Sequence, residues 1–395
     1  MSYEDSPPKQ GVTTTLEAAA AMIHRHTGQR LVSLVPTDRG YNNRLYMADL
    51  DSGRQVVIKL CGRFWHKTKT ETEVVALSLA RAYTNAPVPR VLAWSASTEE
   101  LGAEFIVLEH MPGSPLDQVW KTLDINAKVS IVKQIASIVV SLKTSVISND
   151  GLIGNLKITA SEATAVAAVA AGSDNALDTT PSTPICTSEE VIQQQLYSTD
   201  KTVEHGIGPF PTHLAYIKAV LQREIHDLET MPVFACARPI LPRLGEFVRS
   251  LDSPSDGFPT CQKVVFIHGD MNMQNILIDL QQCPPKVVAI LDWEWSGFFP
   301  EQDEYFGSFD FLDLEGDLAG PDLTNIFFDC LEAAGLETPR TIRSWDMIVQ
   351  LTSLRENIAH WALKLEADPS DPNVQERVMA KMTAVDKALK LLTRI

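Results

Sequence analysis

The feature that most constrains the fold is a polar motif between short apolar runs near residue 270. The motif reads His268-Gly269-Asp270, four variable residues, and Asn275. Three apolar runs surround it, at residues 264–267, 276–280 and 287–291. Short apolar runs bounded by polar turns predict buried strands. Because the third run ends at Asp292, the sequence predicts a small sheet whose strand ends bring together two carboxylates and an amide.

These residue types suit phosphoryl transfer. A loose transition state leaves the protein to position the reactants and neutralise charge. Asp270 could accept the proton of an acceptor hydroxyl, and Asn275 and Asp292 offer oxygen ligands to Mg²⁺. Glu294 could assist a second metal ion, but a supporting role is the commoner one. His268 is expected to lock the loop by hydrogen bonding rather than to transfer a proton.

The motifs resemble those of the aminoglycoside phosphotransferase and choline kinase-like families of the protein-kinase-like fold. There, His-Gly-Asp with a later Asn, followed by Asp-Trp-Glu, stand where protein kinases have His-Arg-Asp and Asp-Phe-Gly. Gly208-Pro209-Phe210 is similar to a segment of fungal members. The resemblance implies a two-lobed α+β fold with ATP and Mg²⁺ as cofactors. It predicts a small antiparallel-sheet N-lobe at residues 1–111 and a larger, mainly helical C-lobe at residues 112–395.

The resemblance also predicts an N-lobe site for the nucleotide phosphates. A turn-rich stretch with Gly40 and Asn42 lies between apolar segments, as a phosphate-covering hairpin requires. Lys59 follows the apolar run 56–58 and would hold the α and β phosphates. By itself, a lysine at a strand end is usually solvated. A helix predicted at residues 70–83 supplies its partner, with Glu73 as the better match and Glu71 as the alternative.

The segment after residue 104 is predicted to link the lobes. Apolar residues 105–108 form a strand that breaks at Pro112-Gly113. In the resembling families this hinge presents backbone groups to the adenine edge, and Glu109 and Met111 would present them here. Because backbone atoms recognise the base, the sequence leaves the choice between ATP and GTP open.

The C-lobe is predicted to be helical around one low-complexity insert. Apolar periodicity indicates helices at 121–142, 217–231, 241–251, 344–365 and 374–392. Residues 159–184 are rich in Ala, Ser, Thr, Asp and Pro, which indicates an insert of little apolar bulk. A plain surface linker is its ordinary interpretation, and a lid near the acceptor is the alternative.

An acidic run follows the predicted metal site. Such a run is usually a solvated face. The alternative is that Glu301, Glu304 and Asp310 line an acceptor pocket that selects ammonium groups, as acidic loops do in the resembling kinases. A formal net charge of −16 argues against nucleic acid or an anionic membrane as partner and favours a cationic or neutral small molecule.

Other composition features point to a cytoplasmic enzyme. The beginning of the sequence lacks a basic-then-apolar signal pattern, and we expect no membrane-spanning segment of about 18 apolar residues. Six cysteines occur without Cys-x-x-Cys spacing, so reduced thiols are expected rather than zinc ligands or disulfides. The oligomeric state cannot be inferred from the sequence.

We therefore predict a kinase that transfers the γ-phosphoryl group of ATP to a hydroxyl of a small molecule, such as an amino alcohol, an aminoglycoside-like compound or a secondary metabolite. Two alternatives remain. One is a nucleotide-binding pseudokinase that serves as a scaffold. The other is different nucleotide-dependent chemistry on the same fold in a biosynthetic pathway, since fold does not determine reaction.

Overall fold

The structure, a computed structural model, describes most of the chain. The described residues are 7–148, 150–157, 187–188, 191–192, 207–253, 258, 263–315, 322–366 and 368–393. The predicted insert at about 159–184 lies outside them. Its interpretation as a linker or a lid therefore stays a prediction.

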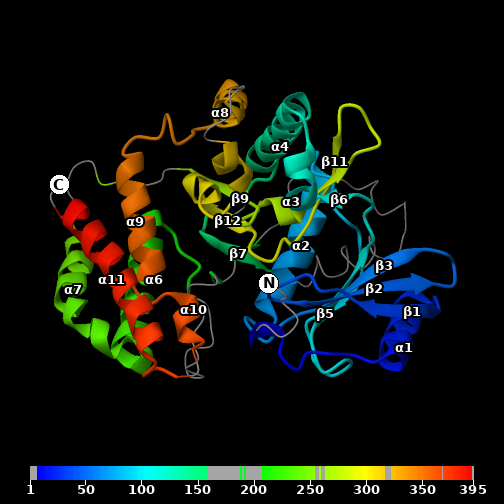
Figure 1. The fold of residues 1–395 in the computed structure, drawn as a ribbon, viewed down its shortest axis with the longest axis horizontal. Coiled ribbons are helices and arrows are strands. Elements are labelled where there is room, and N and C mark those ends of the chain that lie inside the picture. Colours follow the sequence, from blue (N-terminus) through cyan, green and yellow to red (C-terminus); the bar gives the residue numbers. More distant parts are fainter. Residues whose placement is uncertain are drawn as a thin grey trace.

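An antiparallel sheet of five strands forms the first part of the chain (Figure 1). Its strands are β1 (Leu31–Pro36), β2 (Arg44–Leu50), β3 (Gln55–Leu60), β4 (Val91–Ser95) and β5 (Phe105–Glu109). They are ordered β1-β2-β3-β5-β4. Val56, Ile58 and Leu60 of β3 are fully buried. Burial of this central strand places Lys59, between Ile58 and Leu60, inside the protein as well.

Two helices accompany the sheet. Helix α1 (Leu16–Thr27) packs its buried face against the strands and is capped at its start by the Thr15 side chain. Helix α2 (Thr68–Tyr83) corresponds to the helix predicted at 70–83 and contacts β4 and β5. The Glu104 carboxylate accepts the Lys67 backbone N–H at 2.7 Å just before α2 begins. Helix α2 is thereby tied to the sheet that carries Lys59.

Two smaller sheets support the region of residue 270. Strand β6 (Ser114–Pro115) joins β10 (Ile276–Asp279) and β11 (Lys286–Ile290) in the order β11-β10-β6. The other sheet has the order β8-β7-β12-β9. Its members are β7 (Gly154–Lys157), β8 (Thr187–Ser188), β9 (Val264–Ile267) and β12 (Gly297–Pro300). The strands predicted around the motif are therefore present, while β12 was not predicted.

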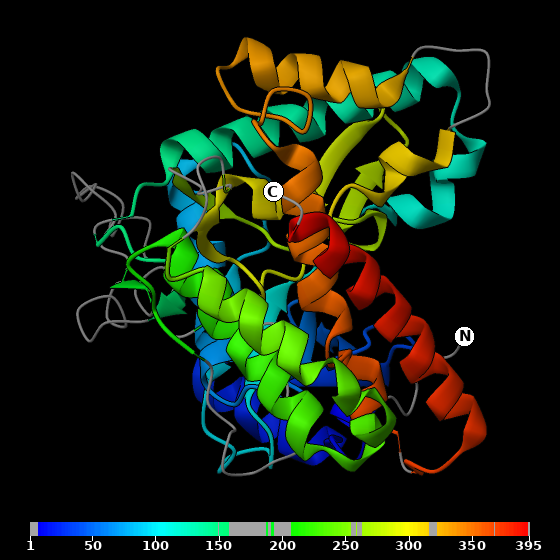
Figure 2. The same cartoon turned by 90° about the vertical axis from the view of Figure 1, so that its left-hand side faces the viewer.

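The rest of the described chain is mostly helical. The α-helices are α3 (Leu116–Val119), α4 (Ile125–Ser145), α6 (His213–Thr230), α7 (Leu241–Ser250), α8 (Leu323–Ala333), α9 (Trp345–Asn357), α10 (Trp361–Lys364) and α11 (Pro372–Leu392). Short 3-10 helices occur at Pro7–Lys9, Trp120–Thr122, Pro232–Ile240, Met273–Asn275, Glu301–Tyr305 and Asp310–Glu315. Figure 2 shows α8 beside α4, and α11 crossing α9. The predicted α+β fold, with a small antiparallel sheet and a larger helical part, is confirmed.

One predicted helix is divided in two. The pattern at 344–365 predicts one continuous helix, whereas the structure has α9 and α10 with a turn between them. Ile358 and Ala359 are fully buried at this turn, and His360 caps the new helix by accepting the Ala362 N–H. Because the turn residues are buried, they continue the apolar pattern, so periodicity does not reveal the break.

Helix α4 corrects the expectation that no segment is apolar enough to cross a membrane. By length and hydropathy, Ile125–Ser145 alone among the described helices could do so. Its buried residues, which include Ile131, Ile135 and Val139, belong to a hydrophobic cluster shared with α2 and α8. A core helix passes the same test of length and hydropathy, and this packing is that of a core helix.

Candidate active site

The loop after β9 holds the Asp270 carboxylate in place. Asn272 Nδ2 donates to Asp270 Oδ1 at 2.8 Å, and Asn275 Nδ2 donates to Oδ2 at 2.9 Å. His268 is fully buried; its Nδ1 accepts the Asp270 N–H at 3.1 Å and its Nε2 bonds the Leu291 carbonyl at 3.0 Å. Burial, although opposed by this bond to Leu291, lowers the His268 pKa to about 4. A neutral His268 that ties the loop to the residue before Asp292 agrees with its expected locking role.

Gly269 allows this loop to approach its neighbour. Its φ is +82°, and a Cβ there would lie 2.8 Å from the Trp295 carbonyl oxygen. Both observations favour glycine, since other residues rarely adopt this conformation and would collide with the backbone. The glycine of the motif thus has a packing reason beyond its chemistry.

Lys59 and Glu73 form a buried ion pair that also includes Asp292. Lys59 Nζ lies 2.6 Å from Glu73 Oε2 and 2.6 Å from Asp292 Oδ1. Glu71, the alternative partner, instead lies 4.0 Å from the exposed Lys67. Strand β3, helix α2 and the segment after β11 therefore meet at one ammonium group.

Asp292 has an unusual backbone conformation. Its φ is +63°, a region that non-glycine residues seldom adopt and that often marks functional positions. Its side chain is 34% exposed, whereas those of Glu73 and Glu294 are 2% and 0% exposed. Of these three carboxylates, Asp292 is the one open to a ligand.

Glu294 is bound by side chains of the predicted phosphate-covering loop. Asn42 Nδ2 donates to Glu294 Oε1 at 2.8 Å and Asn43 Nδ2 donates to Oε2 at 2.6 Å. Two ammonium groups also face Oε2, with Lys59 Nζ at 3.2 Å and Lys69 Nζ at 3.9 Å. Glu294 therefore joins the loop to the candidate metal site.

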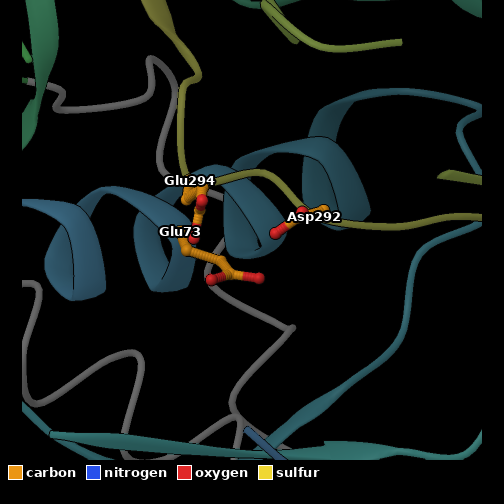
Figure 3. Close-up of side chains that lie close together, drawn as sticks. All are labelled: Glu73, Asp292 and Glu294. Atoms are coloured by element: carbon orange, nitrogen blue, oxygen red, sulfur yellow. The ribbon is translucent and has the colours of Figure 1, made fainter. Parts of the chain in front are cut away.

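The carboxylates outnumber the nearby cations. Glu73, Asp292 and Glu294 lie with one oxygen of each within 4.8 Å of the others (Figure 3). Burial alone would lower the Lys59 pKa. The negative charges of Asp292, Glu73 and Glu294 outweigh burial and raise this pKa well above its usual value. Burial, helped by Asp292 and Glu294 and opposed by Lys59, raises the Glu73 pKa to about 7. Burial raises the Asp270 pKa well above its usual value, and the negative charges of Asp292 and Glu294 add to this rise. A divalent cation would relieve this excess of negative charge.

The oxygen donors fit Mg²⁺ at Asp292 and Asn275. Glu294 already has partners for its negative charge. Burial would raise its pKa, but Lys59, Lys69 and the two loop amides outweigh burial and lower the pKa to about 2. The Asn275 amide nitrogen faces Asp270, which leaves the amide oxygen for a cation. Hard oxygen ligands and an accessible carboxylate are what Mg²⁺ requires. Asn275 and Asp292 therefore stay the predicted metal ligands.

Two of the three predicted acceptor-pocket residues have other surroundings. Glu304 is fully buried and accepts the backbone N–H groups of His268 at 2.8 Å and Gly269 at 3.1 Å. Glu301 is 2% exposed and lies 3.8 Å from the buried Lys143. Both side chains have partners inside the protein, which does not favour a place in a solvent-open acceptor pocket. Their role in acceptor binding stays a prediction.

The third acidic residue keeps its candidate role. Asp310 is exposed and accepts the Met273 N–H of the catalytic loop at 2.9 Å. It therefore lies beside the site with its carboxylate reachable from solvent. Its function in acceptor binding stays a prediction.

The remaining predicted nucleotide residues lie around the covering loop and the hinge. Gly40 has φ +83°, and its carbonyl accepts the buried Lys9 ammonium at 2.6 Å. The Asn42 side-chain amide donates to Glu294 Oε1 at 2.8 Å, which engages one of its two N–H groups in this conformation. The Glu109 N–H donates to the Arg90 carbonyl at 2.9 Å, so this group is engaged within the protein. Recognition of the base by the backbone of Glu109 and Met111 stays a prediction.

Sequence reasoning missed Lys69 and Asn43. Lys69 is 2% exposed and its Nζ donates to Asn43 Oδ1 at 3.0 Å. Its position four residues before Glu73, on the same face of α2, was the available signal. Asn43 gave no comparable signal, because its three hydrogen-bonding partners come from distant segments.

Comparison with known proteins agrees with this geometry. Residues 33–206 match the model of the phosphotransferase enzyme family, APH, a stretch that contains Lys59 and Glu73 and ends before Asp270. The predicted resemblance to this family is confirmed. Beyond the matched residues, the phosphotransferase resemblance depends on the motifs at Asp270 and Asp292 and on the fold.

Curated relatives match over a short stretch. A subtelomeric hrmA-associated cluster protein of Aspergillus fumigatus, found in strains Af293 and CEA10, is 32% identical over 98 residues. The alignment covers 24% of this chain and 19% of the relative, so it spans about a fifth of that protein's length. A fungal origin for the present chain stays a prediction.

Solved structures of phosphotransferases share the fold along nearly the whole chain. A candidate aminoglycoside phosphotransferase of Ralstonia eutropha JMP134 has a TM-score of 0.56 at 14% identity, covering 97% of this chain and 99% of that one. A candidate fructosamine-3-kinase of Thermobifida fusca YX-ER1 has a TM-score of 0.50 at 14% identity, with 96% and 100% covered. The streptomycin–ATP complex of APH(2")-IIa has a TM-score of 0.50 at 10% identity, with 94% and 99% covered. At these identities the likeness shows the fold alone.

Proposed function

We propose that this protein is a kinase that transfers the γ-phosphoryl group of ATP to a hydroxyl of a small molecule. The observation that carries the proposal is the meeting of Lys59, Glu73 and Asp292 at 2.6 Å beside the loop that orients Asp270. Residues from three separate segments meet there. Each has the chemistry that phosphoryl transfer needs.

The proposed roles follow from the geometry. Lys59 would hold the α and β phosphates, and Glu73 would orient its ammonium group. Asp270 would accept the hydroxyl proton as the acceptor oxygen bonds to the γ phosphorus and ADP leaves with the electrons of the broken bond. Asn275 and Asp292 would hold Mg²⁺, which when bound neutralises charge on the transferring phosphate.

The proposed architecture places ATP between two lobes. Residues 1–111 would form the lobe that covers the nucleotide, and residues 112–395 the lobe that carries the catalytic loop. The pairing of β6 with β10 supports this division, since the first strand after residue 111 joins the catalytic region rather than the five-stranded sheet. A cytoplasmic location is part of the proposal.

The charge of the acceptor is to be decided by experiment. Burial of Glu301 and Glu304 weakens the argument for a cationic acceptor, whereas Asp310 is exposed. Neutral sugars and alcohols therefore rank beside amino alcohols and aminoglycosides. One panel of compounds can cover all four classes.

The test is ADP release from ATP and Mg²⁺ in the presence of each compound. A kinase should show stimulation by at least one acceptor, and Asp270→Asn should lower that rate by about a hundredfold or more, since a general base contributes roughly 10²–10⁴ in rate. Asp279→Asn is a matched control, because Asp279 ends β10 and its carboxylate accepts hydrogen bonds from the nearby Gln281 and Gln282. ATP binding without stimulated turnover by any acceptor would instead favour the scaffold or a different chemistry.

A further inference from the structure

Lys69 is a second buried cation beside the candidate site, and the proposed phosphoryl transfer does not use it. It lies in the first turn of α2 and is 2% exposed. A buried lysine is costly unless it is paired and hydrogen-bonded. Its ammonium lies 3.0 Å from Asn43 Oδ1 and 3.9 Å from Glu294 Oε2. These partners join the covering loop to the segment that follows Asp292.

Asn43 is the centre of this connection. Its Oδ1 accepts both the Lys69 ammonium and the Gly62 N–H at 3.1 Å, and its Nδ2 donates to Glu294 Oε2 at 2.6 Å. Asn43 is 3% exposed, so each of these bonds is shielded from water. An amide with one donor and two acceptor contacts to three segments has a single allowed orientation. The loop is therefore held at this residue.

Charge balance explains why a second ammonium is needed. Without Lys69, Lys59 would be the one remaining cation facing Glu73, Asp292 and Glu294 within the described part of the chain. Attraction of Lys59 toward Glu294 would then compete with the orientation that Glu73 gives it. Because Lys69 balances part of the negative charge of Glu294, Lys59 can remain directed toward Asp292, the proposed Mg²⁺ ligand, and stay available to the phosphates.

We propose that Lys69 is a positioning residue for nucleotide binding, acting through Asn43 and Glu294 to hold the covering loop and to keep Lys59 available for phosphate. This inference rests on the proposed function. Lys69 itself need not touch the nucleotide. Its removal should weaken nucleotide binding and loosen the loop without removing the base Asp270.

The test compares Lys69→Met with Lys69→Arg and with Lys67→Met. Lys67 is a matched control, since its side chain is 66% exposed two residues earlier and lies 4.0 Å from Glu71. We expect Lys69→Met to weaken ATP binding by about tenfold, as for loss of a charged hydrogen bond. Lys69→Arg should recover most of that loss, and Lys67→Met should bind as the unmodified protein does. Binding is measured by titration calorimetry, with thermal unfolding to establish that each variant is folded.

Hydrogen exchange gives a readout that needs no nucleotide. The Gly62 amide donates to Asn43 Oδ1, so its exchange should accelerate by about tenfold in Lys69→Met and stay unchanged in Lys67→Met. If the unmodified protein binds no ATP, the proposed function fails, and Lys69 as a nucleotide-positioning residue fails with it. The exchange data then show separately whether Lys69 holds the loop.

A double-mutant cycle separates positioning from simple packing. In the Glu294→Gln background the carboxylate that Lys69 neutralises is gone, so Lys69→Met should weaken ATP binding by much less than tenfold. Fully additive losses, or unchanged ATP affinity and Gly62 exchange in folded Lys69→Met, would overturn the proposal.

Discussion

At the scale of single residues, neutral polar side chains position the charged ones. His268 bonds the Asp270 N–H and the Leu291 carbonyl, and Asn275 bonds the Asp270 carboxylate. These contacts connect the proposed base to the chain segment of Asp292. An imidazole suits this place because one nitrogen accepts while the other donates.

His268→Phe tests this arrangement. We expect the free energy of unfolding at pH 7.5 to fall by about 1–3 kcal/mol, since two partly buried backbone groups lose their partner. His268→Gln, which keeps a donor and an acceptor, should lose less. Urea unfolding followed by tryptophan fluorescence measures both. Equal losses in the two variants would show that hydrogen bonding is not the reason for histidine.

The same residue predicts a pH dependence. Its pKa in the folded state is about 4, below the usual 6.5, so the folded protein binds fewer protons between these values. The stabilisation from His268 is therefore complete above pH 6.5 and is lost as the pH falls toward 4. His268→Gln should reduce the loss of unfolding free energy between pH 7 and pH 5. An unchanged pH dependence would contradict the prediction.

At the scale of elements, close backbone contacts hold the covering loop. Gly62 follows β3, and a Cβ there would overlap the Asn42 carbonyl oxygen and lie 2.9 Å from the Pro8 carbonyl oxygen. Neither neighbour is a flexible side chain. The loop and the preceding N-terminal segment can therefore sit on β3 only if residue 62 lacks a side chain.

Gly62→Ala should be destabilising and Gly245→Ala should not. Overpacking at Gly62 is expected to lower the free energy of unfolding by about 1–3 kcal/mol. Gly245 lies within α7, where an added methyl would meet only the flexible end of Arg249, and alanine should stabilise by about 0.5–1 kcal/mol. Chemical unfolding of both variants measures the difference. A neutral Gly62→Ala would indicate that the loop moves aside at little cost.

Helices α6 and α10 are joined by buried charges. Lys364 Nζ lies 2.6 Å from Asp227 Oδ2 and 3.4 Å from Glu224 Oε1. Burial raises the Glu224 pKa to about 8. The negative charge of Asp227 adds to this rise, and the Lys364 ammonium opposes it. Since α10 also carries Trp361, whose ring lies 5.7 Å from that of Tyr41, this cluster supports a contact with the covering loop.

Glu224 should make the protein less stable as pH rises. Its raised pKa means that the folded state binds more protons than the unfolded state between about pH 4.5 and 8, so unfolding free energy falls across that window. Glu224→Gln should reduce this decline, whereas Glu229→Gln, an exposed change on the same helix, should not. Denaturant unfolding at pH 5, 6.5 and 8 measures the free energy of unfolding of each protein. Identical pH profiles for all three proteins would refute the assignment.

At the scale of the whole molecule, charge from distant segments converges on one place. Glu73, Asp292 and Glu294 face only two buried ammonium groups there, Lys59 and Lys69, among the residues that the structure describes. The covering loop and α10 also meet through Tyr41 and Trp361. Binding of a cation and nucleotide should therefore stabilise both parts of the molecule together.

Mg²⁺ and ATP together should raise the melting temperature more than either alone. A ligand at a hundred times its dissociation constant adds about 2.7 kcal/mol of stability. In Asp292→Asn the additional effect of Mg²⁺ should disappear, while NaCl at equal ionic strength should not reproduce it in the unmodified protein. Chelation of the metal should reverse the shift. A persistent Mg²⁺ effect in Asp292→Asn would place the metal elsewhere.

The sequence by itself determined the element types and the chemistry of the motifs. Short apolar runs predicted the strands around Asp270, and helical periodicity predicted α2 and α4, because both patterns are local properties of the chain. The pairing of Lys59 with Glu73 came from family resemblance. Local patterns could not reveal the break between α9 and α10, since its turn residues are as apolar as the helices.

Only the tertiary structure decided which acidic and polar residues face one another. It buried Glu301 and Glu304, which sequence composition suggested for an acceptor pocket, and it brought Asn43 and Lys69 to Glu294. Burial and contact depend on segments up to about 250 residues apart along the chain, as the Asn43 to Glu294 hydrogen bond shows. The chemistry of each residue can be read from the sequence, whereas its partner is a consequence of the fold.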